Sequence, residues 1–264
     1  MNQLSHMIFA FSFFVALYTG IYAFTVWFEN LSVDVLILYY LGGGLLLAVV
    51  ATPILYYKAP NKSMGDRTTT NAASGAALLF ITFFIGGLGG CVIHQWIYDV
   101  HIAGNMSIFV GSISVLVGAL MPDWDIPFLG IERHRNIVFH SFLLPVIVLL
   151  PTLGRILMMI VFSTVGQLVN YIEPTELYIL GFFMLGYASH LALDVLPSKA
   201  NPWEILWRVV SPLDEAPVGL KTFGPFKVPK KRAKGWLVGN AAFLALIGFG
   251  LIGLYYYYFL VVLP

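Results

Sequence analysis

Long apolar segments alternate with short polar ones along the chain. Most of the apolar segments approach the roughly 20 residues that a helix needs to cross about 30 Å of hydrocarbon. The candidate spans are Met7–Phe28, Val35–Tyr57, Ala72–Ile93, Ser107–Leu120, Ile137–Val169, Leu177–Leu196 and Gly235–Leu263. This pattern predicts an all-α fold, a polytopic α-helical membrane protein with about seven transmembrane helices in a single integral membrane domain.

The segment Ile137–Val169 is too long for one straight span. Its 33 residues would form about 50 Å of helix at 1.5 Å per residue. It contains Pro151, Gly154 and Arg155, and an interior proline removes a helical hydrogen bond, so we expect a break near Pro151. Two interpretations remain open: two spans, or one crossing followed by a bent or interfacial continuation. We favour the single crossing because it keeps the basic loop after it in the cytoplasm.

Lysine and arginine gather in two of the connecting segments. Lys58–Thr70 and Ser198–Lys234 are rich in them, and Glu29–Asp34 has none. Cytoplasmic loops carry such an excess, so we expect the amino terminus, both basic segments and Pro122–Arg135 in the cytoplasm. The first span lacks the basic start and the cleavage site of a signal peptide, so we expect it to be retained.

Composition narrows the possible partners. Of the 264 residues, 59% are hydrophobic, mean hydropathy is +0.85, and the net charge is +1. No nucleic-acid partner is expected, because such binding requires clustered basic surface on a folded face. The single cysteine, Cys91, cannot form an internal disulfide. The oligomeric state is not determined by any of these features.

Ionisable residues gather in two stretches, Met121–Leu144 and Gly186–Pro197, although the chain is only 10% charged. At membrane depth such groups are costly unless they are paired, bind a ligand or face water, so they indicate a functional site. The first stretch contributes Asp123, Asp125, Arg133, His134, Arg135 and His140, and the second contributes His190 and Asp194.

The spacing of these residues suggests metal ligation. The Pro122–Asp125 turn can direct two carboxylates at one ion. His134 and His140 are six residues apart, which is not a same-face helical spacing, so we expect His134 in a turn and His140 in the next helix. His190 and Asp194 lie one helical turn apart on the same face. Mixed imidazole and carboxylate ligands suit a divalent metal such as zinc, with manganese or iron as alternatives.

Three blocks carry a resemblance to a known family: Pro122–Asp125, His134–Ser141 and Gly186–Asp194. In order and spacing they resemble the membrane-bound metal-dependent hydrolases, the LexA-regulated inner-membrane hydrolases of bacteria and archaea. The resemblance covers about Thr70–Trp207. It implies a compact helical fold with a metal site at the cytoplasmic edge, and localisation in the cytoplasmic (inner) membrane of a bacterium or archaeon.

The resemblance also implies a division of the chain and a set of ligands. Residues 1–69 would form an N-terminal two-span extension, 70–207 the hydrolase-like core, and 208–264 a basic loop and C-terminal span. The implied metal residues are Asp123, Asp125, His134, His140, His190 and Asp194. A further histidine usual in the family is absent, because Ala76 stands near its place. His6 is a candidate replacement from another helix.

The expected activity is hydrolysis of a phosphoester or related bond in a membrane lipid or lipid-linked substrate. A metal-activated water would attack, Asp123 would accept its proton, and Arg135 would neutralise the developing charge. The lipid is inferred from the position of the site. For Arg133 and Arg135 an ordinary role as cytoplasmic anchors is the alternative. Ser141 has two possible roles, orienting a ligand or bonding back to its own helix.

Two other functions compete with hydrolysis. The first is a non-catalytic membrane subunit with a structural metal or a polar helix-packing site, which the absent histidine favours. The second is ion transport, against which a cluster confined to one face argues. Outside the matched blocks, we interpret His94 and His101 as packing residues, and we expect Gly42–Gly44 and Gly86–Gly90 to allow close helix contact. Aromatic residues expected at the membrane interface are Trp203, Trp207, Trp236 and Tyr255–Tyr258.

Overall fold

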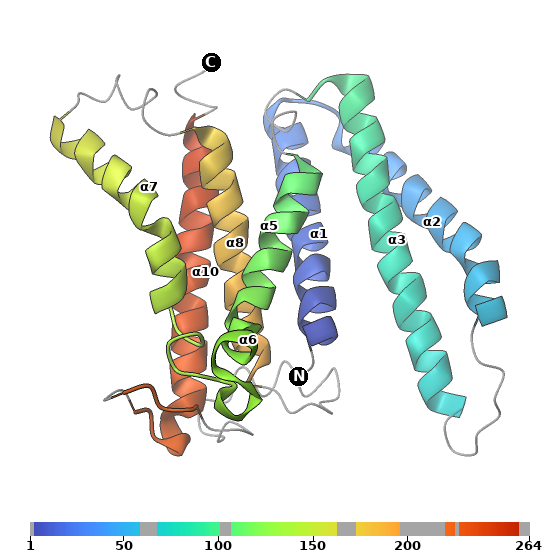
Figure 1. Cartoon of the computed structure of the whole chain (residues 1–264). Helices are drawn as coiled ribbons and strands as arrows, with labels where there is room; N and C mark the ends of the chain where they lie inside the picture. The colour runs from blue at the N-terminus through green and yellow to red at the C-terminus, as the bar shows by residue number, and fades with distance from the viewer. Residues whose placement is uncertain are drawn as a thin grey trace. The chain divides into compact units, whose positions relative to one another are not determined.

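The computed structural model describes residues 3–58, 68–100, 107–162, 173–195, 220–224 and 227–258, and these fold mainly into helices joined by short turns (Figure 1). The long helices are α1 (Gln3–Phe28), α2 (Val33–Lys58), α3 (Thr68–Tyr98), α5 (Ile108–Leu120), α7 (Leu143–Phe162), α8 (Pro174–Leu193) and α10 (Ala233–Tyr257). The short ones are η2 (Met121–Trp124), α6 (Asp125–Leu129), η3 (Ile131–Arg133) and η5 (Lys230–Arg232). The predicted all-α fold is confirmed.

Six helices in the described residues are long and apolar enough to cross a membrane. They are α1, α2, α3, α5 with its extension to Leu129, α8, and α10 with the preceding η5. The apolar part of α7, Leu143–Met158, is shorter. These helices indicate a multi-pass membrane protein, and the seventh crossing remains a prediction.

The expected helix break near Pro151 is wrong. Helix α7 continues through Pro151 to Phe162 and begins only at Leu143, after a series of turns from Ile137. An interior proline costs one backbone hydrogen bond, whereas ending the helix in an apolar segment would leave several polar groups without partners. Continuing the helix is therefore the less costly arrangement. Residues 163–172 lie outside the described part of the chain.

The chain packs as two compact units. Unit 1 comprises Met1–Phe11 and Met106–Pro264, and unit 2 comprises Ser12–Asn105. Helix α1 therefore begins in unit 1 and continues in unit 2. The division into an extension, a hydrolase-like core and a C-terminal part remains a prediction from the resemblance.

Glycines bring α2 and α3 together in unit 2. A Cβ atom on Gly43 would lie 2.4 Å from the carbonyl oxygen of Gly86, and one on Gly90 would lie 2.0 Å from that of Tyr39. Only a residue without a side chain permits this approach of two backbones. The prediction that these glycine-rich segments allow close helix contact is confirmed.

Helix α8 is the centre of unit 1. It packs against both α5 and α10, and nearly all its residues from Leu177 onward are buried. A Cβ on Gly186 would lie 2.0 Å from the carbonyl oxygen of Val115, and one on Gly118 would lie 2.1 Å from that of Phe183. The α5 and α8 backbones are therefore in direct contact, which brings the chain after α5 close to the C-terminal end of α8.

Candidate metal centre

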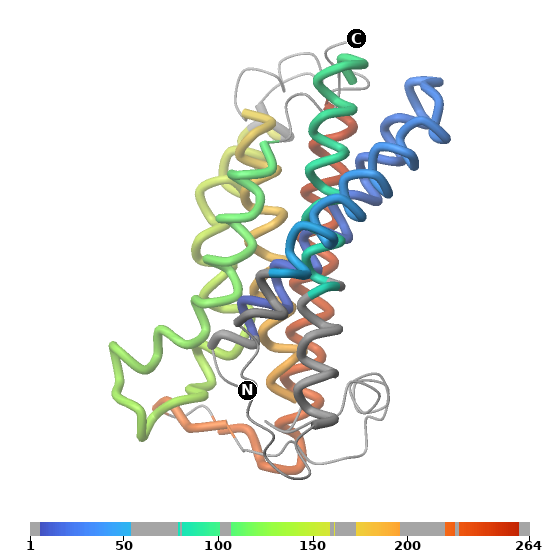
Figure 2. The backbone as a smooth tube through the Cα atoms, turned by 90° about the vertical axis from the view of Figure 1, so that its right-hand side faces the viewer, coloured from blue at the N-terminus to red at the C-terminus, as the bar shows by residue number. Residues whose placement is uncertain are grey.

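The six predicted metal residues lie together at one end of unit 1. The loop between α5 and α7, the C-terminal end of α8 and the first turns of α1 meet there (Figure 2). Asp123, Asp125, His140, His190 and Asp194 are all buried. His134 is the most exposed of the six, with 30% of its side chain accessible.

The tightest group joins the two predicted stretches. His140 Nε2 lies 3.1 Å from Asp194 Oδ2, and His190 Nε2 lies 3.6 Å from the same oxygen. Asp123 Oδ1 lies 3.6 Å from His190 Nε2 and 3.9 Å from His134 Nε2. Residues far apart in sequence thus bring three imidazoles and two carboxylates to one place.

Backbone carbonyl groups orient the two buried imidazoles. His190 Nδ1 lies 2.6 Å from the carbonyl oxygen of Ala119, and His140 Nδ1 lies 3.2 Å from that of Asn136. A carbonyl oxygen only accepts hydrogen bonds, so each Nδ1 carries the proton in these contacts and each Nε2 presents its lone pair. The carbonyl of Ala119 is available because it belongs to the last turn of α5.

Three of the converging atoms have no hydrogen-bond partner among the described residues. They are His140 Nε2, His190 Nε2 and Asp194 Oδ2. Buried polar atoms are normally satisfied, so a group of lone pairs that face one another requires an explanation. Divalent cations would satisfy such lone pairs, and two groups of residues bring their ligand atoms within 4.8 Å of one another: His6, His190 and Asp194, and Asp123, His134 and His140.

His6 adds a third buried imidazole to this group. Its ring stacks on that of His190, with centroids 3.8 Å apart and an interplanar angle of 13°. Its Nε2 lies 3.6 Å from Asp194 Oδ1. His6 therefore lies where it can contribute a ligand from α1. The side chain of Ala76, near the position of the absent family histidine, is outside the described part of the structure.

Asp125 differs from the other carboxylates because both its oxygens are already used. Oδ1 lies 3.0 Å from His134 Nδ1, and Oδ2 accepts a hydrogen bond of 2.9 Å from the backbone N–H of Asn136. The hydrogen bond to Asp125 raises the pKa of His134. These contacts favour Asp125 as the residue that orients His134 and the chain after it.

Arg135 reaches the carboxylate of Asp194. Its Nη2 lies 3.0 Å from Asp194 Oδ1, and its Nη1 donates to the Asp194 carbonyl oxygen at 3.4 Å. Its backbone has a φ of 64°, a conformation that costs energy in a residue with a side chain. Arg133, in contrast, is exposed.

The turn that carries His140 is held by residues of α8 and α10. Trp236 Nε1 donates to the His140 carbonyl oxygen at 3.1 Å, and Asn240 Oδ1 accepts from the backbone N–H of Phe142 at 2.7 Å. Tyr187 donates to the carbonyl oxygen of Phe139. The sequence predicts only an interfacial role for Trp236. The sequence signal that indicates this support is Asn240, a buried polar residue within an apolar helix.

Two local predictions about the site are wrong. His140 lies in the turn before α7 and not in a helix, and the expected Pro122–Asp125 turn is helical, formed by η2 and the start of α6. Helical geometry lets Pro122 occupy a first-turn position, where its missing N–H is not needed. Ser141 bonds locally, to the carbonyl oxygen of Val138 and the N–H of Leu143. The predicted residues His101, Trp203 and Trp207 lie outside the described part.

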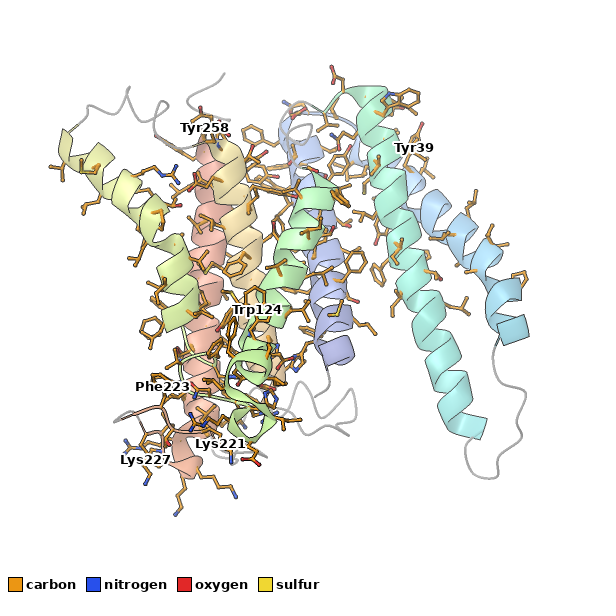
Figure 3. The ribbon with its side chains drawn as sticks, in the orientation of Figure 1. Tyr39, Trp124, Lys221, Phe223, Lys227 and Tyr258 are labelled. Carbon is orange, nitrogen blue, oxygen red and sulfur yellow. The ribbon has the colours of Figure 1, made fainter. Side chains whose placement is uncertain are left out.

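The surface near the centre combines apolar and basic side chains. Trp124, Phe128 and Ile131 are 43%, 70% and 74% exposed. Lys221, Phe223 and Lys227 lie at the same end of unit 1 (Figure 3). The backbone of Lys221 pairs with that of Arg135 and Ile137, which ties this basic segment to the chain of the site.

Comparison of the chain with known protein families, with curated proteins and with solved structures finds no match.

Proposed function

We propose that this protein is a metal-dependent hydrolase of the cytoplasmic membrane, with seven crossings and its centre at the cytoplasmic edge. Its substrate would be a membrane lipid or lipid-linked molecule with a phosphoester or related bond. The proposal rests on the geometry of the described residues and on the resemblance of three sequence blocks to the membrane-bound metal-dependent hydrolases.

One observation carries the proposal. His140 Nε2, His190 Nε2 and Asp194 Oδ2 converge in a buried place without hydrogen-bond partners among the described residues. A purely structural polar cluster would be expected to satisfy its own lone pairs, because an unsatisfied buried polar atom costs about 1–3 kcal/mol.

The donor set for a divalent cation would be drawn from two groups whose ligand atoms lie within 4.8 Å of one another: His6, His190 and Asp194 in the first, and Asp123, His134 and His140 in the second. Zinc suits this donor set best, and manganese or iron are alternatives. When bound, such a cation supplies Lewis acidity, which makes water more acidic and polarises the scissile group.

Two residues of the chain would act on the substrate and its proton. Asp123, whose Oδ1 faces His190 and His134, would accept the proton from the attacking water. Arg135, whose guanidinium is 3.0 Å from Asp194, would hold that carboxylate and oppose the negative charge that develops on a phosphoryl group. Asp125 would keep His134 in place.

The surroundings of the centre support a lipid substrate. Trp124, Phe128 and Ile131 are exposed, and Lys221 and Lys227 are exposed at the same end of unit 1 (Figure 3). Such a mixture of aromatic, apolar and basic groups is typical of the headgroup level of a cytoplasmic leaflet. A centre at this level meets lipid headgroups before it meets soluble molecules.

A non-catalytic subunit with a structural metal is the second candidate. His140, His190 and Asp194 have side chains at most 3% exposed, and a closed site is typical of structural metal ions. The partial exposure of His134 favours access from one side. Only turnover separates the two functions.

Metal analysis of the purified protein tests the centre. The wild type and His94→Ala, which alters a buried histidine in unit 2, are expected to retain stoichiometric metal. His140→Ala and Asp194→Ala are expected to lose it. Equal metal content in all four proteins would overturn the ligand assignment.

Turnover is tested on a panel of membrane lipids and lipid-linked phosphates in mixed micelles. The expected result is release of a water-soluble headgroup or phosphate by the wild type, abolished by a chelator and restored by zinc or manganese. Full metal occupancy without release from any member of the panel would favour the structural subunit.

A further inference from the structure

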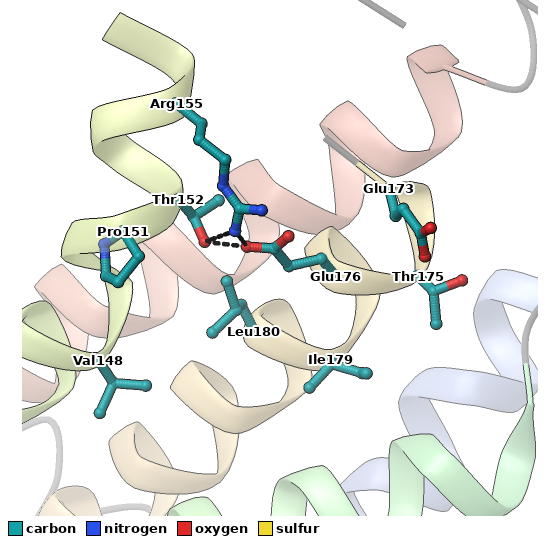
Figure 4. A pocket seen from close by; sticks show the side chains of 9 residues that line it. All are labelled: Val148, Pro151, Thr152, Arg155, Glu173, Thr175, Glu176, Ile179 and Leu180. Atoms are coloured by element: carbon teal, nitrogen blue, oxygen red, sulfur yellow. Dashed lines mark hydrogen bonds and ion pairs between the residues drawn. The ribbon is translucent and has the colours of Figure 1, made fainter. Parts of the chain in front are cut away.

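A groove lies between α7 and α8 (Figure 4). Its volume is about 550 Å³. Along α8 the groove residue Glu176 and the metal-site residue His190 are fourteen residues apart, or about 21 Å at 1.5 Å per residue. The groove is therefore a separate feature, at the other end of unit 1.

The groove is apolar along its length and polar at one end. Val148 and Pro151 of α7 face Ile179 and Leu180 of α8 across the apolar part. Thr152, Arg155, Glu173, Thr175 and Glu176 form the polar end. In membrane helices, charged residues near a helix end lie at the headgroup level and apolar residues lie deeper. The groove thus runs from headgroups into hydrocarbon.

The groove exists because α7 leans away from its neighbours. Figure 1 shows the C-terminal half of α7 diverging from α8 and α10, and α8 packs far more closely on α5 and α10 than on α7. Ile179 stays 36% exposed on a helix that is otherwise largely buried. In a bilayer, acyl chains fill an open apolar groove of this kind.

The charges at the polar end match one class of headgroup. Arg155 Nη2 and Thr152 Oγ1 both donate to Glu176 Oε1. Among the described residues, no side-chain contact uses Glu176 Oε2, either oxygen of Glu173 or the Nη1 of Arg155. Two carboxylates and one guanidinium suit a headgroup that carries both an ammonium and a phosphate, and they disfavour a purely anionic one.

We propose that this groove binds one phospholipid with a primary-amine headgroup, such as a phosphatidylethanolamine. The ammonium contacts Glu173 and Glu176, the phosphate contacts Arg155, and an acyl chain lies along Ile179 and Leu180. The lipid serves as a fixed component between α7 and α8, and it is distinct from any substrate at the metal centre.

Native mass spectrometry tests this site directly. The full-length protein is delipidated and incubated with equal amounts of dioleoyl phosphatidylethanolamine, phosphatidylcholine and phosphatidylglycerol. One phosphatidylethanolamine per chain is expected to be retained about two- to fivefold over the other two, the selectivity expected from one partly exposed charged contact. Equal retention of the three lipids, or preferred retention of phosphatidylglycerol, would overturn the proposal.

Two pairs of variants locate the site. Ile179→Trp fills the apolar part and is expected to reduce lipid retention about tenfold, whereas Leu153→Trp adds the same bulk to an exposed position of α7 outside the groove and should change nothing. Glu176→Gln and Glu173→Gln should each lower the preference for the primary amine. Glu173 has no side-chain partner in the described residues. Glu173→Gln therefore removes a carboxylate without breaking a contact that holds α7.

An equal fall in lipid retention would show that the lipid binds elsewhere, if it is seen in both Ile179→Trp and Leu153→Trp. Unchanged selectivity in both glutamine variants would refute recognition of the amine. Metal content should be unchanged in all four variants, so failure of this proposal is distinguishable from failure of the metal-centre proposal.

Discussion

His190 in unit 1 and His94 in unit 2 are both buried histidines on long apolar helices, yet their surroundings differ completely. His94 Nδ1 shares a hydrogen bond of 2.8 Å with the hydroxyl group of Tyr22. The rings of Tyr39 and Tyr98 cover it, with centroids 5.5 and 4.6 Å away. His190 has its Nδ1 on a backbone carbonyl and its Nε2 turned towards carboxylates.

The two histidines differ in what surrounds the second ring nitrogen, and they do not differ in burial. Aromatic rings surround His94, and no carboxylate contact is seen for it in the described residues. This is the pattern of a histidine used for packing, as predicted for His94. The second nitrogen of His190 faces Asp123 and Asp194 and has no hydrogen bond there. What the ring nitrogens face is therefore what makes His190, and not His94, a candidate metal ligand.

The largest expected effect is the difference in metal affinity between the alanine variants of these two histidines. His190→Ala should lower metal affinity by more than about 100-fold, beyond the range typical of residues that only orient ligands. His94→Ala should leave metal affinity unchanged, since its partners are aromatic. Isothermal titration with zinc measures both. Similar affinities in the two variants would remove the distinction between the two units.

Helix packing in unit 1 gives the next effect. In Gly186→Ala the new Cβ would meet the Val115 carbonyl oxygen at 2.0 Å, so α5 and α8 must separate. Overpacking of this kind lowers the free energy of unfolding by about 1–3 kcal/mol. Each kcal/mol lowers the melting temperature by roughly 2–4 °C. Metal affinity should fall as well, because Asp123 follows α5 and Asp194 follows α8.

Gly89→Ala is the matched control in unit 2, because nothing lies within 4 Å of a Cβ at that position. Thermal unfolding followed by circular dichroism is expected to give the wild-type transition for Gly89→Ala. A wild-type transition for Gly186→Ala would contradict the close α5–α8 contact.

A smaller effect is expected where α10 supports the site. Trp236→Phe removes the hydrogen bond to the His140 carbonyl oxygen and should weaken zinc binding about tenfold, as loss of an orienting partner does. Trp96, which is 86% exposed on α3, provides the control variant Trp96→Phe. Zinc titration of both proteins decides whether α10 contributes to the centre.

The smallest effect should come from the hydrogen bond in unit 2. Tyr22→Phe removes the partner of His94 Nδ1 and should lower the free energy of unfolding by about 1 kcal/mol without changing metal content. Denaturant unfolding and metal analysis of the same preparation test this. A loss of metal in Tyr22→Phe would link His94 to the centre and erase the contrast with His190.

Much of the fold follows from local pattern. Runs of apolar residues predicted the positions of the long helices, because burying backbone hydrogen bonds in lipid requires helix formation whatever the neighbours are. The spacing of His190 and Asp194 likewise predicted a shared helical face. The same local reasoning failed at Pro151 and at His140, where the outcome depends on the cost of alternative conformations and on hydrogen bonds from α8 and α10.

The sequence by itself determined the helical class and the candidate ligands, since both depend on residue type and short-range spacing. Tertiary structure alone decided how each candidate is used. It turned the Nε2 atoms of His140 and His190 inward, engaged both oxygens of Asp125, paired Arg135 with Asp194 and stacked His6 on His190. The longest of these contacts joins residues 184 positions apart, and no local pattern encodes it, because it depends on how the long helices pack.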